Sequence, residues 1–363
     1  MTFDLVLVGF GHVGRRFVRL LDANRSALEG EGLDVRIVGV ATRRHGHAYA
    51  SGGLDAIAIA DRVELGESIG AEGGVSRRSG AATAFIRDAV RRSATAASHG
   101  HVVVVETTTL DIERGQPAID HVRTALDCGA HVVTANKGPV AFAYGALARA
   151  AERAGRRFLF EGAVMDGIPI FNLVRDTLPG VSVTGFRGVV NSTTNYILTA
   201  MESGEPFDAA LAAMQRAGIA EADASFDVDG WDAAAKTAAL ANVLLGARLT
   251  PASVAREGVA GVTPARVKTA RAEGRRLKLV ARAERVGRAV LARVAPEELP
   301  GDDLLAGLEG QQNALVLQTD LLGEIAVVQR GSGLTMTAYA LMADLITIAR
   351  QLALHRRAPR ARR

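Results

Sequence analysis

The stretch MTFDLVLVGFGHVG, residues 1–14, decides the fold of the first half of the chain. A short apolar run, Phe3 to Val8, leads into the glycine turn of residues 9–14, and apolar residues at helical spacing follow it. A second β-branched run spans residues 35–40. Strand, glycine turn, helix and strand, in this order, are typical of a dinucleotide-binding unit, although a glycine turn also occurs in unrelated α/β folds.

The three glycines of this turn have separate uses in such a unit. Gly9 permits the tight turn, Gly11 lets the backbone approach a pyrophosphate, and Gly14 lets the helix pack closely on the strand. The N–H groups at the start of the helix then face the phosphates. We therefore predict a dinucleotide site at residues 9–14.

Strands and helices continue to alternate through the first half of the chain. After a loop-rich insertion at residues 43–80 with one short helix, we expect strands at 101–106 and 131–134 and a helix at 117–127. This alternation predicts a parallel sheet whose ligand-binding groups lie at the carboxyl ends of its strands. Thr107 and Lys137 follow two such ends.

The second half of the chain has a different, α+β pattern. After a helix at about 140–154, we expect strands at 157–161 and 183–190, helices at 196–202, 207–217 and 230–245, an antiparallel pair at 314–319 and 324–329, and a closing helix at 335–354. The predicted organisation is a Rossmann-type domain at 1–138, a catalytic and dimerisation domain at 139–330, a helix at 331–355 that returns to the first domain, and a basic tail at 356–363.

Composition excludes several classes of protein. No apolar run reaches the roughly 20 residues that span a membrane, and the single cysteine, Cys128, excludes an internal disulfide framework. No basic segment precedes the first apolar run, so we expect no signal peptide and a cytoplasmic location. Five arginines after Leu354 account for the net charge of +4, which argues against a nucleic-acid-binding face.

Lysines are rare in this chain. Lys and Arg together number 43, yet lysine occurs only at positions 137, 236, 268 and 278. A lysine pKa can be lowered to the range of a proton donor, whereas arginine stays charged. Lys137 at a strand end and Lys236 on a helix are therefore candidate catalytic groups.

An acidic cluster precedes the helix that carries Lys236. Its members are Glu221, Asp223, Asp227 and Asp229, and Asp232 lies one turn before the lysine. Taken alone, the pattern also fits a well-capped helix with an i,i+4 ion pair. The spacing of a calcium-binding EF-hand is absent.

Several motifs together resemble the homoserine dehydrogenase family from the first strand to the last helix. They are the glycine turn, Val133 to Pro139, Glu161 to Pro169, Asn191 to Leu198, Gly218 to Lys236, and Gly331-Ser332-Gly333 with Thr337-Ala338. The resemblance implies reversible hydride transfer between nicotinamide and L-aspartate 4-semialdehyde, which gives L-homoserine in threonine, methionine and isoleucine biosynthesis.

The resemblance also assigns residue roles. Lys236 is the first choice for the proton donor, Lys137 lies between nicotinamide and substrate, Glu221 binds the substrate ammonium group, and Asp227 and Asp232 orient or support these groups. Further residues would contact the cofactor: Gly9, Phe10, Gly11, His12, Val13, Gly14, Thr107, Gly218 and Gly333. No acid follows the second strand until Asp55, and Arg43 with Arg44 suits a 2′-phosphate, so we favour NADP over NAD.

The family has a monovalent-cation site, such as one for Na⁺, in the loop at residues 161–168. The matching contributors are Glu161, Val164, Asp166 and Ile168, mainly through backbone carbonyls. The chain departs from the family at Met165 and Asp166, where small residues are usual, and at the threonines of residues 107–109, where glycines are usual.

Two alternatives stay open beside this hypothesis. One is a dehydrogenase for another small amino aldehyde or hydroxy amino acid, and the other is a catalytically silent sensor that binds the cofactor. The resemblance further implies a homodimer or homotetramer, and we expect no C-terminal amino-acid-sensing domain because the chain stops soon after the closing helix.

Overall fold

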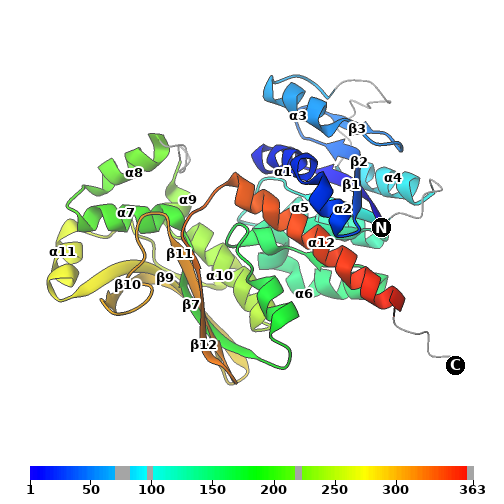
Figure 1. The fold of residues 1–363 in the computed structure, drawn as a ribbon. Coiled ribbons are helices and arrows are strands. Elements are labelled where there is room, and N and C mark those ends of the chain that lie inside the picture. The colour runs from blue at the N-terminus through cyan, green and yellow to red at the C-terminus, as the bar shows by residue number, and fades with distance from the viewer. Residues whose placement is uncertain (70–81, 96–100, 217–222, 358–363) are drawn as a thin grey trace.

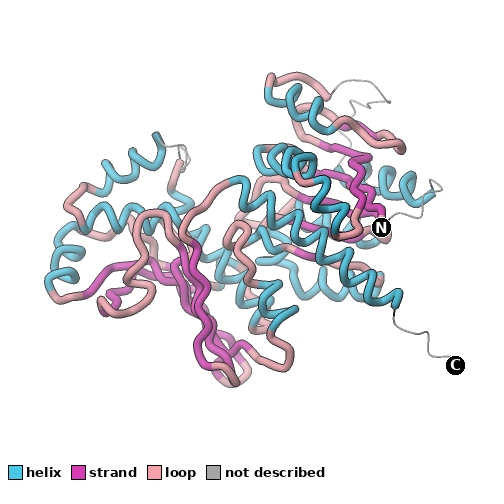
Figure 2. Tube along the Cα trace, in the orientation of Figure 1, coloured by secondary structure: helices cyan, strands magenta, loops and turns pink. Residues whose placement is uncertain are grey.

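The computed structural model describes residues 1–69, 82–95, 101–216 and 223–357, and it has two lobes (Figure 1). Each lobe is built on a six-stranded sheet. Figure 2 shows the strands of the two sheets as separate groups with helices around and between them. No helix in the described ranges is long and apolar enough to cross a membrane.

The first sheet has the strand order β3-β2-β1-β4-β5-β6. Its strands are β1 (Thr2–Val8), β2 (Asp34–Ala41), β3 (His47–Tyr49), β4 (His101–Glu106), β5 (His131–Thr134) and β6 (Phe158–Leu159). All neighbours pair in parallel except β2 and β3. Val8 pairs with both Ala41 and Glu106, and Glu106 pairs with Thr134, so the carboxyl ends of four strands lie side by side.

Helices cover both faces of this sheet. They are α1 (His12–Ala23), α2 (Arg25–Gly30), α3 (Ala56–Glu64), α4 (Ala82–Thr95), α5 (Ala118–Asp127) and α6 (Lys137–Ala154). Side chains along a strand alternate between faces. Accordingly Phe3, Leu5 and Leu7 pack with α1 and α3, whereas Val6 and Val8 belong to the core with α4, α5 and α6.

The second sheet has the order β12-β11-β7-β9-β10-β8 and is antiparallel except between β8 and β10. Its strands are β7 (Val183–Val189), β8 (Ala255–Arg256), β9 (Arg275–Val286), β10 (Ala289–Pro300), β11 (Asn313–Thr319) and β12 (Gly323–Gln329). The helices of this lobe are α7 (Ser192–Glu202), α8 (Phe207–Arg216), α9 (Ser225–Val228), α10 (Trp231–Leu244) and α11 (Pro264–Ala272).

Two helices join the lobes. The alanine-rich helix α10 is buried on most sides and packs on α6 of the first lobe as well as on β9 and β10 of the second. The last helix, α12 (Leu334–Arg357), lies along α1, and its residues Leu341, Leu345 and Ile348 share a core with Phe3 and Phe17. Figure 1 shows α12, in red, crossing the first lobe from the second.

Several predicted boundaries need correction. Helix α6 begins at Lys137 because the Asn136 side chain accepts a hydrogen bond from the Gly138 N–H and caps it. The strand expected at 157–161 is only β6, and Glu161 begins a 3₁₀ turn. The domain boundary expected after residue 138 lies too early, because β6 still pairs with β5 of the first sheet.

The hairpin of β9 and β10 was not predicted at all. Both strands carry charged residues at positions that an alternating pattern would leave apolar. Ion pairs accommodate these charges, as between Arg282 and Glu297 and between Arg276 and Glu202. The insertion at 43–80 contains α3, as expected, and also the short strand β3.

Candidate active site

The glycine turn between β1 and α1 has the geometry of a dinucleotide cradle. Gly9 has a φ of +89°, and a Cβ there would lie 2.6 Å from the carbonyl carbon of Thr107. A Cβ on Gly14 would lie 3.0 Å from the Gly9 oxygen, whereas a Cβ on Gly11 would have nothing within 4 Å. The turn is therefore closely packed at Gly9 and Gly14 and open at Gly11, where a pyrophosphate would approach the start of α1.

A buried carboxylate, that of Glu106, organises the neighbouring strand ends; the sequence placed it at a strand end but did not predict this role. Glu106 accepts hydrogen bonds from the Thr134 hydroxyl at 2.9 Å and from the hydroxyl and N–H of Thr108. The Thr107 hydroxyl donates to the Gly9 oxygen at 2.9 Å. In the sequence Glu106 is visible as an acid at the end of a β-branched strand. In the structure its bonds to Thr108, with the bond from Thr107 to Gly9, hold the loop after β4 against the glycine turn.

The remaining residues predicted for the cofactor lie in different environments. Val13 lines a cavity next to the turn, and His12 is exposed beside it. The Phe10 side chain is buried in the core, so only its backbone faces the turn. Gly333 is exposed directly before α12. Gly218 lies outside the described residues.

Arg43 and Arg44 are exposed after the carboxyl end of β2. Within the described part of the chain neither arginine forms an ion pair. No acidic residue occupies the turn between β2 and β3. The end of the second strand thus presents positive charge where an NAD enzyme usually has a carboxylate.

The two predicted catalytic lysines meet at one carboxylate. Lys137 is the first residue of α6, and its Nζ lies 3.3 Å from Oδ1 of Asp232. Lys236 lies one turn after Asp232 on α10, and its Nζ is 3.0 Å from Oδ2 and donates to the Val190 oxygen at 2.6 Å. Lys137 of the first lobe and Lys236 of the second, 99 positions apart in the sequence, therefore form one charged cluster with Asp232.

Burial and charge act in opposite directions within this cluster. Burial alone would raise the pKa of Asp232, but the ammonium groups of Lys236 and Lys137 outweigh it and hold that pKa well below its ordinary value. Burial likewise would lower the pKa of Lys236, yet Asp232 outweighs burial and the pKa is raised. Asp232 therefore favours the charged ammonium form of Lys236.

Asn191 connects the cluster to a second acid. Its Nδ2 donates to Oδ1 of Asp227 at 2.8 Å and to Oδ2 of Asp232 at 2.9 Å. Burial, with the nearby negative charge of Asp232, raises the pKa of Asp227. Asp227 is thus joined to Asp232 through Asn191, while Glu221, the predicted ammonium-binding residue, lies outside the described residues.

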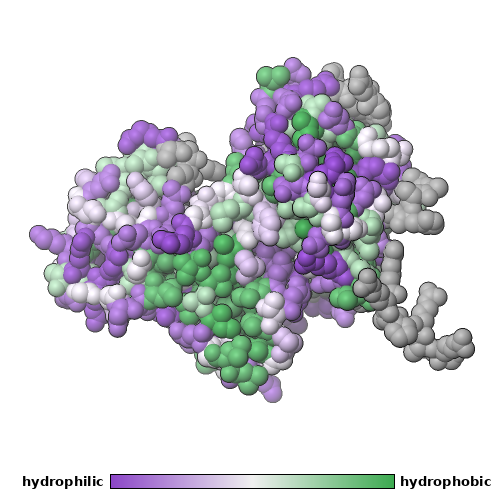
Figure 3. Space-filling model, in the orientation of Figure 1, coloured by the Kyte–Doolittle hydropathy of each residue, from purple (hydrophilic) through white to green (hydrophobic). Residues whose placement is uncertain are grey.

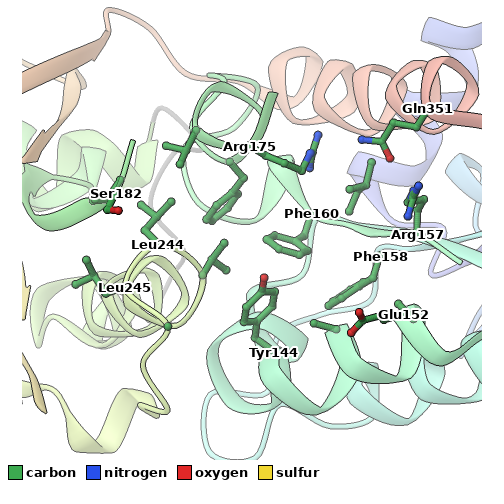
Figure 4. A pocket seen from close by; sticks show the side chains of 18 of the residues that line it. Tyr144, Glu152, Arg157, Phe158, Phe160, Arg175, Ser182, Leu244, Leu245 and Gln351 are labelled. Atoms are coloured by element: carbon green, nitrogen blue, oxygen red, sulfur yellow. The ribbon is translucent and has the colours of Figure 1, made fainter. Parts of the chain in front are cut away.

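A cavity of about 230 Å³ lies between the cluster and the glycine turn. Its lining brings together both lysines and the cofactor side of the sheet, namely Val13, Thr107, Thr108, Ala135, Asn136, Lys137, Gly162, Ala163, Val164, Asp166, Lys236 and Thr337. A larger cavity of about 1090 Å³ opens elsewhere, between α6, α10 and the loop after β6 (Figure 4). Figure 4 shows aromatic side chains such as Tyr144 and Phe160 there, and neither catalytic lysine lines it.

In the loop at residues 161–168 both side-chain carboxylates are already hydrogen-bonded, so a monovalent cation would be held mainly by main-chain carbonyls. Glu161 already accepts hydrogen bonds from three backbone N–H groups, those of Ile170, Phe171 and Asn172. The Asp166 carboxylate accepts from two side chains. Among the described residues no hydrogen bond is donated to the carbonyls of Val164, Asp166 or Ile168. These free carbonyls fit the expected site.

Comparisons with known proteins agree with this geometry. Residues 9–161 match the family model of the homoserine dehydrogenase NAD-binding domain, and residues 169–346 match that of homoserine dehydrogenase. An NAD(+)-dependent homoserine dehydrogenase of Pseudomonas canavaninivorans is 36% identical over 95% of this chain and 96% of its own. A homoserine dehydrogenase of Methanocaldococcus jannaschii is 34% identical over 95% of this chain and 98% of its own.

The fold of the chain is also similar to that of a solved homoserine dehydrogenase. The homoserine dehydrogenase of Thiobacillus denitrificans superposes with a TM-score of 0.79 at 30% identity, over 99% of this chain and 76% of that one. The two family models together span nearly the whole sequence, and they divide it where the first sheet ends. The chain therefore belongs to the homoserine dehydrogenase family.

Proposed function

We propose that this chain catalyses the reversible, NAD(P)-dependent interconversion of L-aspartate 4-semialdehyde and L-homoserine. The observation that carries the proposal is the cavity that Lys137 and Lys236 share with the dinucleotide turn. A substrate seated there lies between two ammonium groups and the cofactor cradle. Reduction of an aldehyde requires such a place, because negative charge develops on the carbonyl oxygen as hydride arrives.

Each charged residue has a defined part in this mechanism. The nicotinamide supplies or accepts the hydride when it is bound. The Lys236 ammonium stabilises the developing alkoxide and donates the proton to it, and in the reverse direction neutral Lys236 accepts the hydroxyl proton. Lys137 contributes the second positive charge. Asp232 holds both ammonium groups in place, since it bonds to each of them.

The raised pKa of Lys236 suits reduction at neutral pH. An ammonium group whose pKa lies above the ordinary value is fully protonated at pH 7 and can stabilise an alkoxide. Oxidation of homoserine needs the neutral amine, so alkaline pH should favour that direction. Asp227 and Glu221 are proposed to bind or orient the substrate ammonium group.

We propose that Arg43 and Arg44 contact the 2′-phosphate of NADP. Both are exposed at the carboxyl end of β2 and no acid replaces them there. One relative is named as NAD(+)-dependent, so the comparisons support a nicotinamide dinucleotide in general, and the proposed preference for NADP rests on these two arginines alone. The free carbonyls at 164, 166 and 168 are likewise proposed to bind a monovalent cation.

We further propose that the second sheet forms a dimer interface. Its edge strand β12 is unpaired on one side within the described sheet, and Val328, Leu321 and Leu322 are exposed on it and on its turn. Figure 3 shows an apolar area over the strands of this lobe. Exposed edges and contiguous apolar surface are typical of association sites.

The proposed reaction is tested by oxidation of L-homoserine at alkaline pH, followed at 340 nm with NADP and NAD in parallel. Turnover with either cofactor supports the reaction and identifies the preferred nucleotide. A folded protein that binds NADPH but oxidises no homoserine would contradict the substrate assignment. Turnover of a different hydroxy amino acid in that case would identify the alternative dehydrogenase.

A further inference from the structure

The start of α12 is locked to the loop at residues 162–167 by side chains and by close backbone packing. Oδ2 of Asp166 accepts a hydrogen bond from Nε2 of Gln329 at 2.8 Å, and Oδ1 accepts from the Thr337 hydroxyl at 3.1 Å. Gln329 ends β12 and Thr337 lies in the first turn of α12. One carboxylate thus spans the connection between the two elements.

That connection includes the segment Gly331–Gly333, here called the closing segment. Its three residues are exposed, and a Cβ on Gly331 or Gly333 would have nothing within 4 Å. Within the described residues the Ser332 hydroxyl bonds only to Gln311, at 3.3 Å. The Gly333 carbonyl accepts from the Met336 N–H at 2.9 Å, so the segment is held at its junction with α12, and the residues on either side of it carry its position.

The loop that carries Asp166 is shaped for this contact. Asp166 has a φ of +49°, the only positive φ of a non-glycine residue in the described part of the chain. A Cβ on Gly167 would lie 2.4 Å from the Met336 oxygen, so only glycine allows the loop to lie this close to α12. An unfavourable backbone conformation held by surrounding contacts is frequent where a side chain must be positioned for function.

The locked region borders the place where the cofactor would bind. Thr337 and Asp166 line the same cavity as Val13 of α1 and Lys236. The Arg16 Nε of α1 donates to the Thr335 hydroxyl at 2.8 Å, so the start of α12 lies against the helix whose N-terminus would face the phosphates of a bound cofactor. A shift of the closing segment would therefore change the wall of the nucleotide site.

We infer that Asp166 is a positioning residue that latches the closing segment beside the bound nicotinamide dinucleotide. It acts through Gln329 and Thr337, and the effect inferred here is on cofactor retention. The inference rests on the proposed function, because it takes the cavity of the two lysines as the place of hydride transfer. Asp166 is well suited to this role because its two oxygens reach both flanks of the segment at once.

The latch is tested with full-length variants and the cofactors NADPH and NADH. In Asp166→Ala the dissociation constant for the preferred cofactor should rise about tenfold or more, since hydrogen bonds to a charged group are lost. The KM for that cofactor should rise in parallel with the dissociation constant. Asp166→Asn should restore most of the affinity, because asparagine accepts the Thr337 bond and tolerates a positive φ.

A double-variant cycle distinguishes a latch from a local disturbance. Thr337→Val alone should weaken cofactor binding by about threefold, and adding it to Asp166→Ala should cause no further loss. Asp302→Ala, which removes an exposed acid elsewhere in the chain, is the matched control and should leave the affinity unchanged. If Asp166→Ala does not fold, Thr337→Val and Gln329→Met each remove one side of the latch and should still weaken binding.

Unchanged cofactor affinity in these variants would overturn the inference, as would a loss of kcat with intact affinity, which would place Asp166 in the chemical step. Cofactor titration needs no substrate. The latch can therefore be assessed even if the wild-type protein fails to oxidise homoserine, and such a failure would count against the proposed reaction alone.

Discussion

Replacing Asp232 by asparagine removes the charge that joins the two lysines. Asp232→Asn keeps the shape of the side chain, while Lys236 at 3.0 Å and Lys137 at 3.3 Å lose their common counter-ion. Burial then acts on Lys236 without the opposing carboxylate, and its pKa must fall. The neutral amine becomes available at lower pH, so the pH profile of homoserine oxidation should move in the acid direction.

The geometry sets the size of this shift. Two unit charges 3.0 Å apart interact by about 5 kcal/mol at an effective dielectric constant of about 20, which corresponds to roughly 4 pKa units. Lys137 shares the same carboxylate and the side chains keep some contact with water, so only part of this effect should be realised. We expect the acid limb of kcat/KM to move down by about one to two pH units.

The assay is kcat/KM for L-homoserine between pH 6 and 10.5 at saturating cofactor. Asp227→Asn is the matched control, because Asp227 contacts the same Asn191 amide but forms no ion pair with either lysine in the described structure. Its profile should move by less than that of Asp232→Asn. Coincident profiles for wild type and Asp232→Asn would refute the electrostatic role given to Asp232.

Further outcomes follow from other parts of the molecule. Changing Arg43 and Arg44 together to alanine should weaken NADPH binding more than NADH binding. Equal losses of affinity for the two cofactors would show that neither arginine recognises the 2′-phosphate. Val328→Glu, on the exposed edge strand, should lower the apparent mass in light scattering from dimer to monomer, and an unchanged mass would place the interface elsewhere. Exchanging sodium and potassium for tetramethylammonium should lower the melting temperature if the free carbonyls near Val164 bind a cation, and an unchanged temperature would contradict that site. Burial lowers the pKa of Lys278 to about 8, so the folded state binds fewer protons than the unfolded state between this value and the ordinary lysine pKa. Stability to urea should therefore increase by up to ~3 kcal/mol as pH rises through that window, and Lys278→Met should abolish the increase.

Short-range patterns predicted the central strands and the glycine turn of the first lobe, but not α2, α4 or β3. The order of apolar runs, the glycine turn and the strand-end residues identified β1, β4, β5 and the dinucleotide site, because each depends on neighbours in sequence. The same reasoning failed for β9 and β10. Their charged residues are satisfied by partners such as Glu297 and Glu202, and pairings of this kind do not appear in local periodicity.

The sequence named both lysines of the charged cluster, but it did not predict their electrostatic environment. Lys137 and Lys236 were identified because lysine is rare in the chain and the motifs resemble a known family. Their meeting at Asp232 depends on α10 of one lobe packing against α6 of the other, which no local pattern encodes. The direction of the Lys236 pKa shift follows from that contact, so the sequence could not predict this shift either.

The most direct test of the mechanism compares wild type with Lys236→Ala in homoserine oxidation and in NADPH binding. We predict that turnover falls by roughly 10²–10⁴, as is typical when a general acid–base group is removed, while NADPH still binds with its original affinity. Unchanged turnover in Lys236→Ala would contradict the proposed proton transfer by Lys236, whatever substrate the enzyme uses.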